Sequence, residues 1–515
     1  MKQKLRWDEI IGILFLGVSI GMLGLSVYFC FSSDIWYDEL FTMGLARQSC
    51  GNLISITARD VHPPFYYLIV KLFLLGMGKS SIAWQVTVAK LVSCIPFFFC
   101  ILLSLNKIRK KFGMLPAGLF SFFLFSMPQM ADYTVEIRMY GFALLFITAG
   151  MLYAYEILLS PYTIKAWIML TVCAVLACYT HYFACIAACM IYLYLLIGML
   201  RYRKEKQMYK SYLISSLICI AAYGPWLLGA VAGQVGRIKE NYWIPAVSWR
   251  TFGGCVKFIF QPSFANETVN TVAAVVFFLI YLLVVILTVA KAIKKKENRE
   301  KTFFALGCIG VLVGLVLFGI LASIILRPIF VYRYMLPAMG IFWLAFALLL
   351  SDLKEKKAVM IPILLFLSVV GIRNFRAFYG EEMWKKIQME QALEELEQIN
   401  SEDIIIYNFD QLQAVASYYL CNDTYLWYGN TEELIREMYP RNNSLVEGEF
   451  TDEAGIAHIK DLLQEGKNVW FLGSGNARDE ILEKWKQENI DFEEKGSAMI
   501  ERYWFNIYYI TTNVD

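Results

Sequence analysis

The sequence predicts an α-helical protein that crosses a membrane many times and ends in a small α/β domain. Hydrophobic residues make up 58% of its 515 residues, whereas a soluble protein usually has about 45–50%. Eleven apolar stretches approach the ~20 residues that a helix needs to cross a bilayer. Basic residues dominate up to Arg376, and acidic residues outnumber them afterwards. This asymmetry indicates a membrane body followed by a separate water-soluble tail.

The basic segments between the apolar stretches predict how the chain crosses the membrane. Short runs of Lys and Arg stay on the cytoplasmic side, and such runs occur at 1–6, 106–111, 201–206, 291–301 and 354–357. Placing all of them inside predicts a cytoplasmic N-terminus, an external C-terminus and spans at about 9–31, 82–105, 114–131, 139–159, 164–182, 183–200, 211–230, 270–290, 303–326, 335–350 and 358–372. The first span is too long for the apolar part of a signal peptide, so we expect it to be retained.

One further apolar segment, residues 63–78, is not counted as a span. It is short, Lys71 interrupts it, and counting it would place the basic run at 106–111 outside. We interpret it as an amphipathic helix in the outer interface of the membrane. Residues 32–81 then form one long external loop.

In this topology the polar residues of the apolar region fall on the external side. They are Asp38, Glu39, Asp60 and His62 in the first loop, Lys90 in the outer half of the second span, and Glu136, Arg138, His181, Arg327 and Arg333 in later connections. Each has a purely structural alternative, such as an arginine that extends towards the interface. Arginines in short external loops oppose the usual charge bias, so we expect them to neutralise an anion.

Together these groups favour a phosphate-bearing lipid substrate that reacts at the external side. An arginine binds phosphate through two parallel N–H groups. A carboxylate within reach accepts the proton of an attacking hydroxyl. Asp38 and Glu39 are the candidate carboxylates, and the arginines are the candidate phosphate ligands.

Five short segments carry a resemblance to a known family. They read YDELFTMGLAR, ARDVHPPFYYLIVKLF, VEIRMYGFALL, YTHYFA and YRYMLPA, in that order. Over residues 1–370 the chain resembles bacterial family 39-type glycosyltransferases of the GT-C fold, whose relatives include protein O-mannosyltransferases and lipid A aminoarabinose transferases. The resemblance implies a sugar donor linked to polyprenyl phosphate, an inverting single displacement and an extracytoplasmic acceptor.

The resemblance also implies roles for individual residues. Asp38 matches the catalytic carboxylate that deprotonates or orients the acceptor, and Glu39 supports it. Arg138 matches the arginine that holds the donor phosphate, with help from Arg333. The other substrate-binding positions are Asp60, His62, Lys90, Glu136, Tyr140 and His181. The common motif QEARMY reads VEIRMY here, so Val135 replaces its glutamine and the role of that glutamine is not transferred.

The resemblance leaves the metal requirement and the acceptor open. Some relatives bind a metal near the site and others need none. No cofactor is therefore firmly implied, and a divalent metal held by Asp60, His62 and His181 is the alternative. The expected partners are the lipid-linked donor, membrane lipid and a glycan, lipid, wall polymer or protein acceptor, with no nucleic acid. The expected location is the cytoplasmic membrane, with the active site and the C-terminal domain on its extracytoplasmic face.

The chain is expected to divide into a glycosyltransferase domain at 1–375 and an α/β domain at 376–515. In the tail, DIIIYN, NVWFLG and YWFNIYYITT read as strands, and QLQAVASYYL and ARDEILEKWKQENI read as helices. The glycine-containing segment FLGSGNARDE, at 471–480, fits a strand that turns into a helix, with Ser474 or Asn476 as its cap. A single cysteine, Cys421, excludes a disulfide framework there.

Two other classes of function compete with the transferase. One is a flippase or transporter for a lipid-linked anionic substrate, and the other is a membrane-anchored sensor that uses the tail. Transporters usually carry internal repeats and polar groups near the midplane of the membrane, whereas here the polar groups gather at one face. The tail has no recognisable ligand site, which argues against a sensor.

Overall fold

The computed structural model describes residues 6–77, 80–160, 163–202, 205–231, 233–234, 244–295, 298–429, 431–446 and 450–512. The chain forms two compact units. The first consists of Met1–Phe29, Thr57–Ile69 and Lys90–Tyr379, and the second of Cys30–Ile56, Val70–Ala89 and Gly380–Asp515. The second unit therefore joins two stretches of the predicted external loop to the C-terminal residues.

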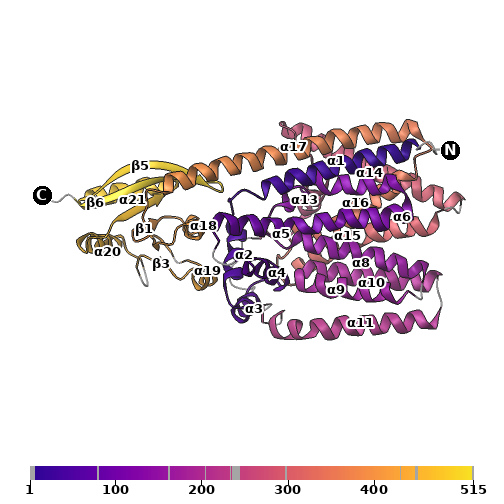
Figure 1. Cartoon of the computed structure of the whole chain (residues 1–515), viewed down its shortest axis with the longest axis horizontal. Coiled ribbons are helices and arrows are strands. Elements are labelled where there is room, and N and C mark those ends of the chain that lie inside the picture. Colours follow the sequence, from indigo (N-terminus) through magenta and orange to yellow (C-terminus); the bar gives the residue numbers. More distant parts are fainter. Residues whose placement is uncertain are drawn as a thin grey trace. The chain divides into compact units, whose positions relative to one another are not determined.

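Helices make up the first unit, and in Figure 1 they run side by side along a common direction. Each predicted span overlaps a helix: α1 (Trp7–Phe29), α5 (Ile82–Leu103), α7 (Met114–Ser126), α8 (Tyr140–Leu159), α9 (Ile164–Thr180), α10 (Tyr182–Tyr202), α11 (Lys206–Trp226), α14 (Glu267–Lys295), α15 (Arg299–Ile325), α16 (Leu336–Ser351) and α17 (Lys357–Leu396). Among the described residues, nine helices are long and apolar enough to cross a membrane. The chain is thus a multi-pass membrane protein. The helices α7, with 13 residues, and α9, with 17, are not among those nine, in which α16 counts together with the turn before it as the 20-residue segment Tyr332–Ser351.

Shorter elements connect these helices. They are α4 (Phe65–Leu75), η1 (Ser104–Ile108), α6 (Arg109–Phe112), η2 (Asp132–Thr134), η3 (Leu227–Val231), α13 (Trp249–Phe260) and η4 (Tyr332–Met335). The segment at 63–78 does form a helix, α4, as its sequence predicts. The last predicted span continues without a break into the charged segment that follows it, as one helix, α17, of 40 residues.

The centre of the first unit is α16, in which all 16 residues are buried. A helix that is apolar on every side is stable only where other helices or lipid surround it. The Trp343 ring lies 5.8 Å from that of Phe123 on α7 and 5.6 Å from that of Phe277 on α14. Small residues let other helices approach closely: a Cβ atom on Gly118 of α7 would lie 2.0 Å from the Gly12 carbonyl oxygen of α1.

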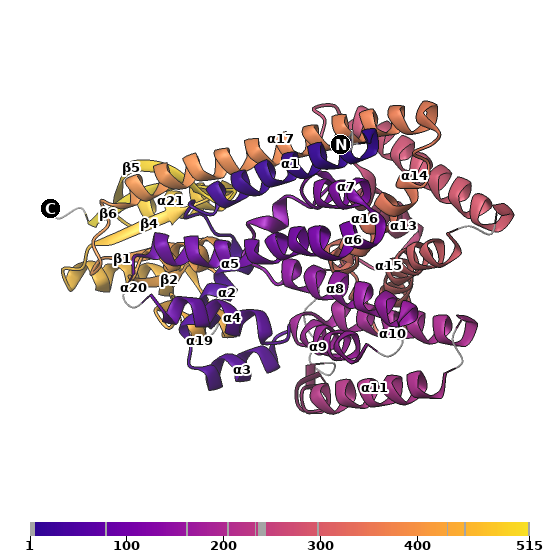
Figure 2. The same cartoon turned by 45° about the vertical axis from the view of Figure 1, so that its right-hand side comes forward.

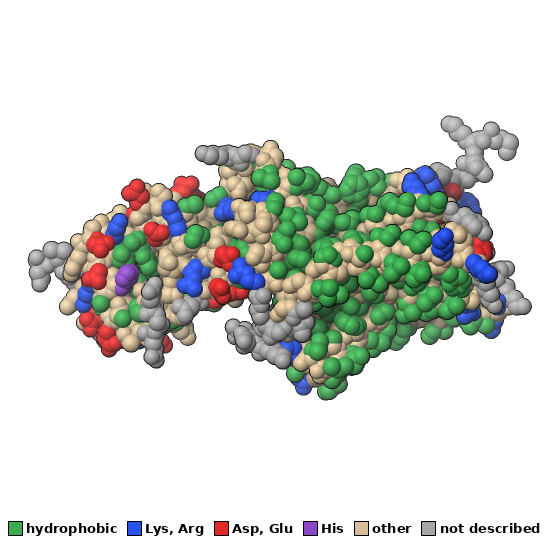
Figure 3. All heavy atoms as spheres, turned by 90° about the horizontal axis from the view of Figure 1, so that it is seen from below, with side chains coloured by type: hydrophobic (Ala, Val, Ile, Leu, Met, Phe, Trp, Pro, Cys, Tyr) green, Lys and Arg blue, Asp and Glu red, His purple; other side chains and the backbone are tan. Residues whose placement is uncertain are grey.

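The outer surface of the helical unit is hydrophobic. Figure 3 shows hydrophobic side chains covering most of its visible face. Large apolar side chains of the membrane helices are well exposed, among them Leu317 (54%) on α15 and Ile286 (62%) on α14. Such an extended apolar surface is unfavourable in water and favourable in lipid.

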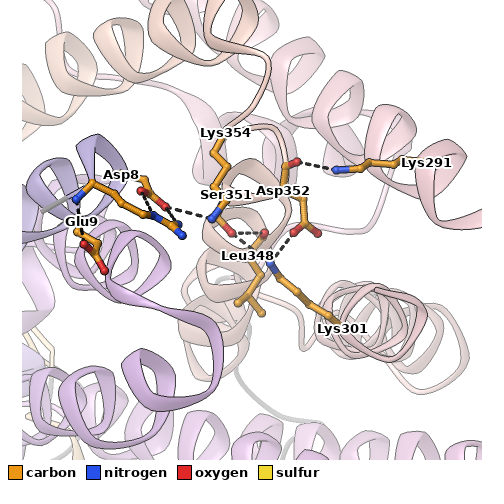
Figure 4. Close-up of polar contacts among 9 residues, drawn as sticks. Asp8, Glu9, Lys291, Lys301, Leu348, Ser351, Asp352 and Lys354 are labelled. Atoms are coloured by element: carbon orange, nitrogen blue, oxygen red, sulfur yellow. Dashed lines mark hydrogen bonds and ion pairs between the residues drawn. The ribbon is translucent and has the colours of Figure 1, made fainter. Parts of the chain in front are cut away.

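Ion pairs and hydrogen bonds join the helices at one end of this unit (Figure 4). Lys301 of α15 donates to the Asp352 carboxylate at 2.7 Å and to Ser351 Oγ at 3.2 Å. Lys291 of α14 donates to the Asp352 carbonyl oxygen at 3.1 Å, and Lys354 donates to Asp8 of α1 at 3.1 Å. The turn after α16 thus connects three other helices.

Lys301→Ala is expected to lower the free energy of unfolding by about 1–3 kcal/mol, because it leaves a mostly buried carboxylate and hydroxyl without this donor. Lys257→Ala is the matched control. Its ion pair with Glu267 is exposed, since the exposed fractions of the Lys257 and Glu267 side chains are 59% and 67%. Such exposed pairs contribute little to the free energy of unfolding. Denaturant unfolding in detergent measures both variants, and equal losses would contradict the structural role of Lys301.

The second unit contains a six-stranded sheet in the order β3-β2-β1-β4-β6-β5. Its strands are β1 (Ile404–Tyr407), β2 (Asp423–Leu426), β3 (Asn442–Ser444), β4 (Val469–Gly473), β5 (Ile490–Ile500) and β6 (Tyr503–Thr512). The first four in that order run parallel, and β6 and β5 are antiparallel. Its helices are α2 (Tyr37–Arg47), α18 (Asp410–Tyr419), α19 (Glu433–Met438), α20 (Asp452–Gln464) and α21 (Gly475–Gln487), and α3 (Cys50–Arg59) belongs to it through Ile56.

The three strands and two helices predicted in the tail are confirmed, as β1, β4, β6, α18 and α21. The strands cover a core that contains Ile406, Phe471 and Trp485. Ser474 occupies the cap position of α21, but its hydroxyl donates to the Trp504 carbonyl oxygen at 2.6 Å and its oxygen accepts no hydrogen bond from the N–H groups of this helix.

Candidate functional site

The acidic pair lies in the first turn of α2, in the second unit. Trp36 is extended and α2 begins at Tyr37, so Asp38 and Glu39 follow directly. The Glu39 carboxylate accepts a hydrogen bond from the Trp36 backbone N–H at 3.0 Å, and its side chain is buried. A carboxylate at this position satisfies a free N–H and complements the positive end of the helix. Glu39 therefore fixes the turn that presents Asp38.

A lysine holds the other end of α2. Lys71 Nζ donates to the carbonyl oxygens of Ala46 at 3.3 Å and Gln48 at 2.6 Å. A cation stabilises the negative end of a helix, where carbonyl groups lack partners inside the helix. In the sequence, Lys71 only interrupts an apolar segment. Its role as a cap depends on a contact between residues 23–25 positions apart, which no local pattern reveals.

Tyrosines from the C-terminal residues bind the backbone around α2. Tyr439 donates its hydroxyl hydrogen to the Leu40 carbonyl oxygen at 3.1 Å, and Tyr419 donates to that of Ser33 at 2.6 Å. The Tyr37 hydroxyl in turn donates to Glu432 at 2.8 Å. Burial, together with the Glu432 charge, raises the pKa of Tyr37, so it stays a neutral donor. The α/β fold thus supports the helix that carries Asp38.

Gly44→Ala should destabilise the second unit by about 1–3 kcal/mol, because the added methyl group overpacks this contact. Its Cβ would lie 2.9 Å from both Met438 Sδ and Tyr439 Cε2. Gly51→Ala on α3 is the control, since the nearest atom to its Cβ is 4.0 Å away. Alanine there is expected to stabilise the helix by up to about 1 kcal/mol. Thermal unfolding compares the two variants, and equal effects would contradict close packing at Gly44.

A cluster of rings forms a second group of candidate residues, in the first unit. The His62 and His181 ring centroids are 5.7 Å apart, and that of Tyr140 is 5.4 Å from that of His181. The ring centroid of Tyr334 lies 5.0 Å from that of His181. Asp60 Oδ2 is 3.3 Å from His62 Nδ1. Four of the five segments that carry the family resemblance therefore contribute to this cluster. They provide Asp60 and His62, Tyr140, His181, and Tyr334.

His181 is held as a neutral imidazole in this cluster. Its Nδ1 accepts a hydrogen bond from the Phe183 backbone N–H at 3.1 Å, so the ring proton resides on Nε2. The side chain is 2% exposed. Burial, and then the charges of His62, Arg138 and Arg333, lower the pKa of His181 well below its ordinary value. It can therefore donate one hydrogen bond without adding a charge.

Two arginines lie near the same cluster. Arg138 is buried in the turn before α8, where its backbone N–H donates to the Glu136 carbonyl oxygen at 2.7 Å. Arg333 lies in η4, and both guanidinium groups act electrostatically on Tyr140 and His181. Within the described part of the chain the buried Tyr140 hydroxyl has no hydrogen-bond partner. Two cations and a buried hydroxyl suit a phosphate group.

The remaining predicted residues lie in the same unit. Lys90 is 1% exposed on α5, and one turn later Ser93 shares a 2.6 Å hydrogen bond with the Tyr66 hydroxyl. Glu136 is half-buried next to the buried Val135. The roles of Asp38, Glu39 and these residues stay predictions.

The described residues do not fit the alternative of a metal held by Asp60, His62 and His181. No three His, Cys, Asp or Glu side chains in this part of the chain are placed to hold an ion. The Phe183 N–H occupies Nδ1 of His181, and Asp60 faces Nδ1 of His62. We therefore derive no step through a metal.

The helical unit and the α/β unit define the class of this protein: it is a polytopic membrane protein with a GT-C fold. ArnT from Cupriavidus metallidurans, in the apo state, has a similar structure, with a TM-score of 0.61 and 11% sequence identity over 97% of both chains. ArnT from the same organism bound to undecaprenyl phosphate gives a TM-score of 0.58, with 11% identity over 98% of both chains. No family model and no curated protein matches the chain.

Proposed function

We propose that this protein transfers a sugar from a polyprenyl-phosphate-linked donor to an extracytoplasmic acceptor. The observation that carries the proposal is the cluster around Tyr140, with its two neighbouring arginines and its neutral histidine. The similarity to ArnT, a protein whose structure has been solved with undecaprenyl phosphate, supports a lipid-phosphate ligand. The expected class is a family 39-type hexosyl- or pentosyltransferase of the cell envelope, similar to the mannosyltransferases.

The donor phosphate is the leaving group in this reaction. As the bond between the anomeric carbon and the phosphate oxygen breaks, negative charge grows on the phosphate. Arg138 and Arg333 stabilise that charge best when they are already placed and shielded from water. The Tyr140 hydroxyl and His181 Nε2–H provide uncharged donors near these arginines. Polyprenyl phosphate is then released.

The acceptor hydroxyl is the nucleophile. Its oxygen forms the new bond to the anomeric carbon from the side opposite the leaving phosphate, which inverts the configuration. The hydroxyl proton passes to the Asp38 carboxylate, while the neighbouring Glu39 carboxylate caps the helix. Positioning and proton acceptance together account for a large part of the rate in such displacements.

The proposed topology follows the basic segments of the sequence. The N-terminus faces the cytoplasm, and Asp38, Arg138 and the α/β domain face the other side of the cytoplasmic membrane. Glycan, lipid, wall polymer and protein acceptors all offer a hydroxyl group to such a site. A GT-C fold gives no support to the flippase alternative.

Mass spectrometry of envelope glycans and membrane lipids tests the proposal. Cells that lack the protein are expected to lose one sugar addition and to accumulate the polyprenyl-phosphate sugar. Wild-type protein should restore the glycan, and Asp38→Asn should not. An unchanged set of glycans, with lipid-linked sugar trapped on the cytoplasmic side, would overturn the transferase and favour a flippase.

A further inference from the structure

A network of hydrogen bonds joins the end of α11 to the last turn of α3, within the first unit. Trp226, the last residue of α11, donates its indole N–H to the Tyr182 hydroxyl oxygen at 3.2 Å. Tyr182, the first residue of α10, donates its hydroxyl hydrogen to Gln234 Oε1 at 2.5 Å. Gln234 Nε2 donates to the carbonyl oxygens of Thr57 at 3.0 Å and Ala58 at 3.3 Å. The network therefore links α10 and α11 to a helix far earlier in the sequence.

The donors and acceptors of this network can be arranged in one way only. Carbonyl oxygens accept hydrogen bonds and never donate them, so the amide nitrogen of Gln234 must face Thr57 and Ala58. The amide oxygen of Gln234 then faces Tyr182, whose hydroxyl must donate to it. Gln234 is 3% exposed, and a buried amide is costly unless its hydrogen bonds are made. Tyr182 is therefore needed to complete the bonds of Gln234.

Gln234 caps the C-terminal end of α3, which ends at Arg59. The carbonyl groups at the end of a helix are satisfied by partners from outside it, and the Gln234 amide binds two carbonyl groups of the last turn. Asp60 follows directly, and its Oδ2 atom lies 3.3 Å from His62 Nδ1. The cap therefore fixes the point from which the chain leaves α3 towards this pair.

The other end of the network lies next to His181. Tyr182 is the following residue, and the backbone N–H one position further, that of Phe183, donates to His181 Nδ1 at 3.1 Å. The ring centroids of His181 and His62 are 5.7 Å apart. The hydrogen bond between Tyr182 and Gln234 therefore connects the backbone that carries one histidine to the backbone that carries the other.

We propose that Tyr182 and Gln234 are positioning residues for the Asp60–His62 pair. They fix the end of α3 and with it the place of the His62 ring beside His181. The inference rests on the proposed function, in which the cluster around His181 binds the donor phosphate. The apparent affinity of a site falls with the fraction of the protein that holds the binding arrangement. Loss of the network should therefore weaken the binding of the donor.

Two variants interrupt the network at different points. Tyr182→Phe lacks the hydroxyl group, and Gln234→Met lacks both the donor and the acceptor of the amide. Each should weaken the binding of polyprenyl phosphate to the purified full-length protein by about three- to tenfold, the factor that one net hydrogen bond contributes. The double variant should bind no more weakly than the weaker single variant, because both changes interrupt the same network.

Tyr179→Phe is the matched control. The Tyr179 hydroxyl donates to the Ala222 carbonyl oxygen at 2.8 Å and so joins α9 to α11, which run side by side (Figures 1 and 2). This variant loses a hydrogen bond of the same kind but keeps the cap of α3, so it should bind polyprenyl phosphate like wild type. Wild-type affinity in Tyr182→Phe would overturn the inference. An equal loss of affinity in Tyr179→Phe would also overturn it, since general loosening of the helices would then be the cause.

The ring signals of the histidines test the same inference without substrate. The chain has three histidines, and His458 lies on α20 of the second unit. In NMR spectra of protein labelled with ¹³C in its histidine rings, Tyr182→Phe and Gln234→Met should shift the His62 signal and leave that of His458 in place. Tyr179→Phe should leave both in place. The His62→Gln variant identifies the His62 signal by its loss.

The two measurements separate this inference from the proposed function. An unshifted His62 signal in Tyr182→Phe overturns the inference even where sugar transfer is confirmed. A shifted signal in a protein whose wild type neither binds polyprenyl phosphate nor transfers a sugar overturns the proposed function and leaves the positioning of His62 in place. Should Gln234→Met fail to fold, Tyr182→Phe decides alone, because it removes a single oxygen atom.

Discussion

Asp38→Asn is expected to reduce kcat by about 10²–10⁴-fold and to leave donor affinity close to that of the wild type. The asparagine amide has the shape of the aspartate carboxylate but cannot take up the proton that the acceptor hydroxyl releases. The helix should persist, because Glu39 and Lys71 still cap its two ends. Turnover of a polyprenyl-phosphate sugar by purified protein measures kcat, and binding of polyprenyl phosphate alone measures the affinity for the phosphate-bearing part of the donor.

Asp461→Asn is the matched control for this experiment. Asp461 is exposed on α20 of the same unit, so the same chemical change there should leave kcat unaltered. Wild-type turnover in Asp38→Asn would show that another group accepts the proton. A loss of polyprenyl phosphate binding in this variant would instead show that Asp38 helps to bind the donor.

Arg138→Ala is expected to weaken donor binding by about tenfold and to lower kcat by about 10²–10³-fold, since the charge on the leaving phosphate is greatest in the transition state. Arg138 is 4% exposed, so water does not replace the lost guanidinium well. Arg138→Lys keeps the charge but loses the two parallel N–H groups. It should fall between the alanine variant and the wild type in both kcat and donor affinity.

The control for Arg138 is Arg109→Ala, which removes an exposed arginine from α6 of the same unit. Donor titrations of both variants with polyprenyl phosphate give the affinity, and single-turnover kinetics give the rate. If Arg138→Ala lowered the thermal stability of the protein but left donor affinity and rate unchanged, the arginine would be structural and a different cation would hold the phosphate.

The helical part of the fold could be predicted from the sequence because its signal is local. A span such as α16 is a continuous apolar run, and burial on all sides requires such a run. The strands β1, β4 and β6 could be recognised for the same reason. In contrast, β2 (DTYL), β3 (NNS) and the edge strand β5 (IDFEEKGSAMI) are short or polar. Their pairing partners define them, and those partners are distant in the sequence.

The residues of the candidate site also fall into two groups, those that the sequence alone reveals and those that only the structure reveals. Asp38, Arg138 and His181 could be singled out because polar residues next to apolar spans are costly without a reason. The residues that hold α2, the helix that carries Asp38, could not be singled out from the sequence. Lys71 and Tyr439 resemble ordinary residues of an apolar segment and of a soluble tail until their contacts with the α2 backbone are known.

The contacts of α2 also determine when the protein becomes competent during its synthesis. An isolated helix of 11 residues is marginally stable, and the tyrosine that binds the Leu40 carbonyl oxygen is made 399 residues later. At about 5–20 residues per second, the ribosome needs about 20–80 s to cover that distance. During this interval the carboxylate that we propose as the proton acceptor, Asp38, is not yet held in place. If Asp38 has that role, a nascent chain that has already entered the membrane stays inactive until the α/β domain folds.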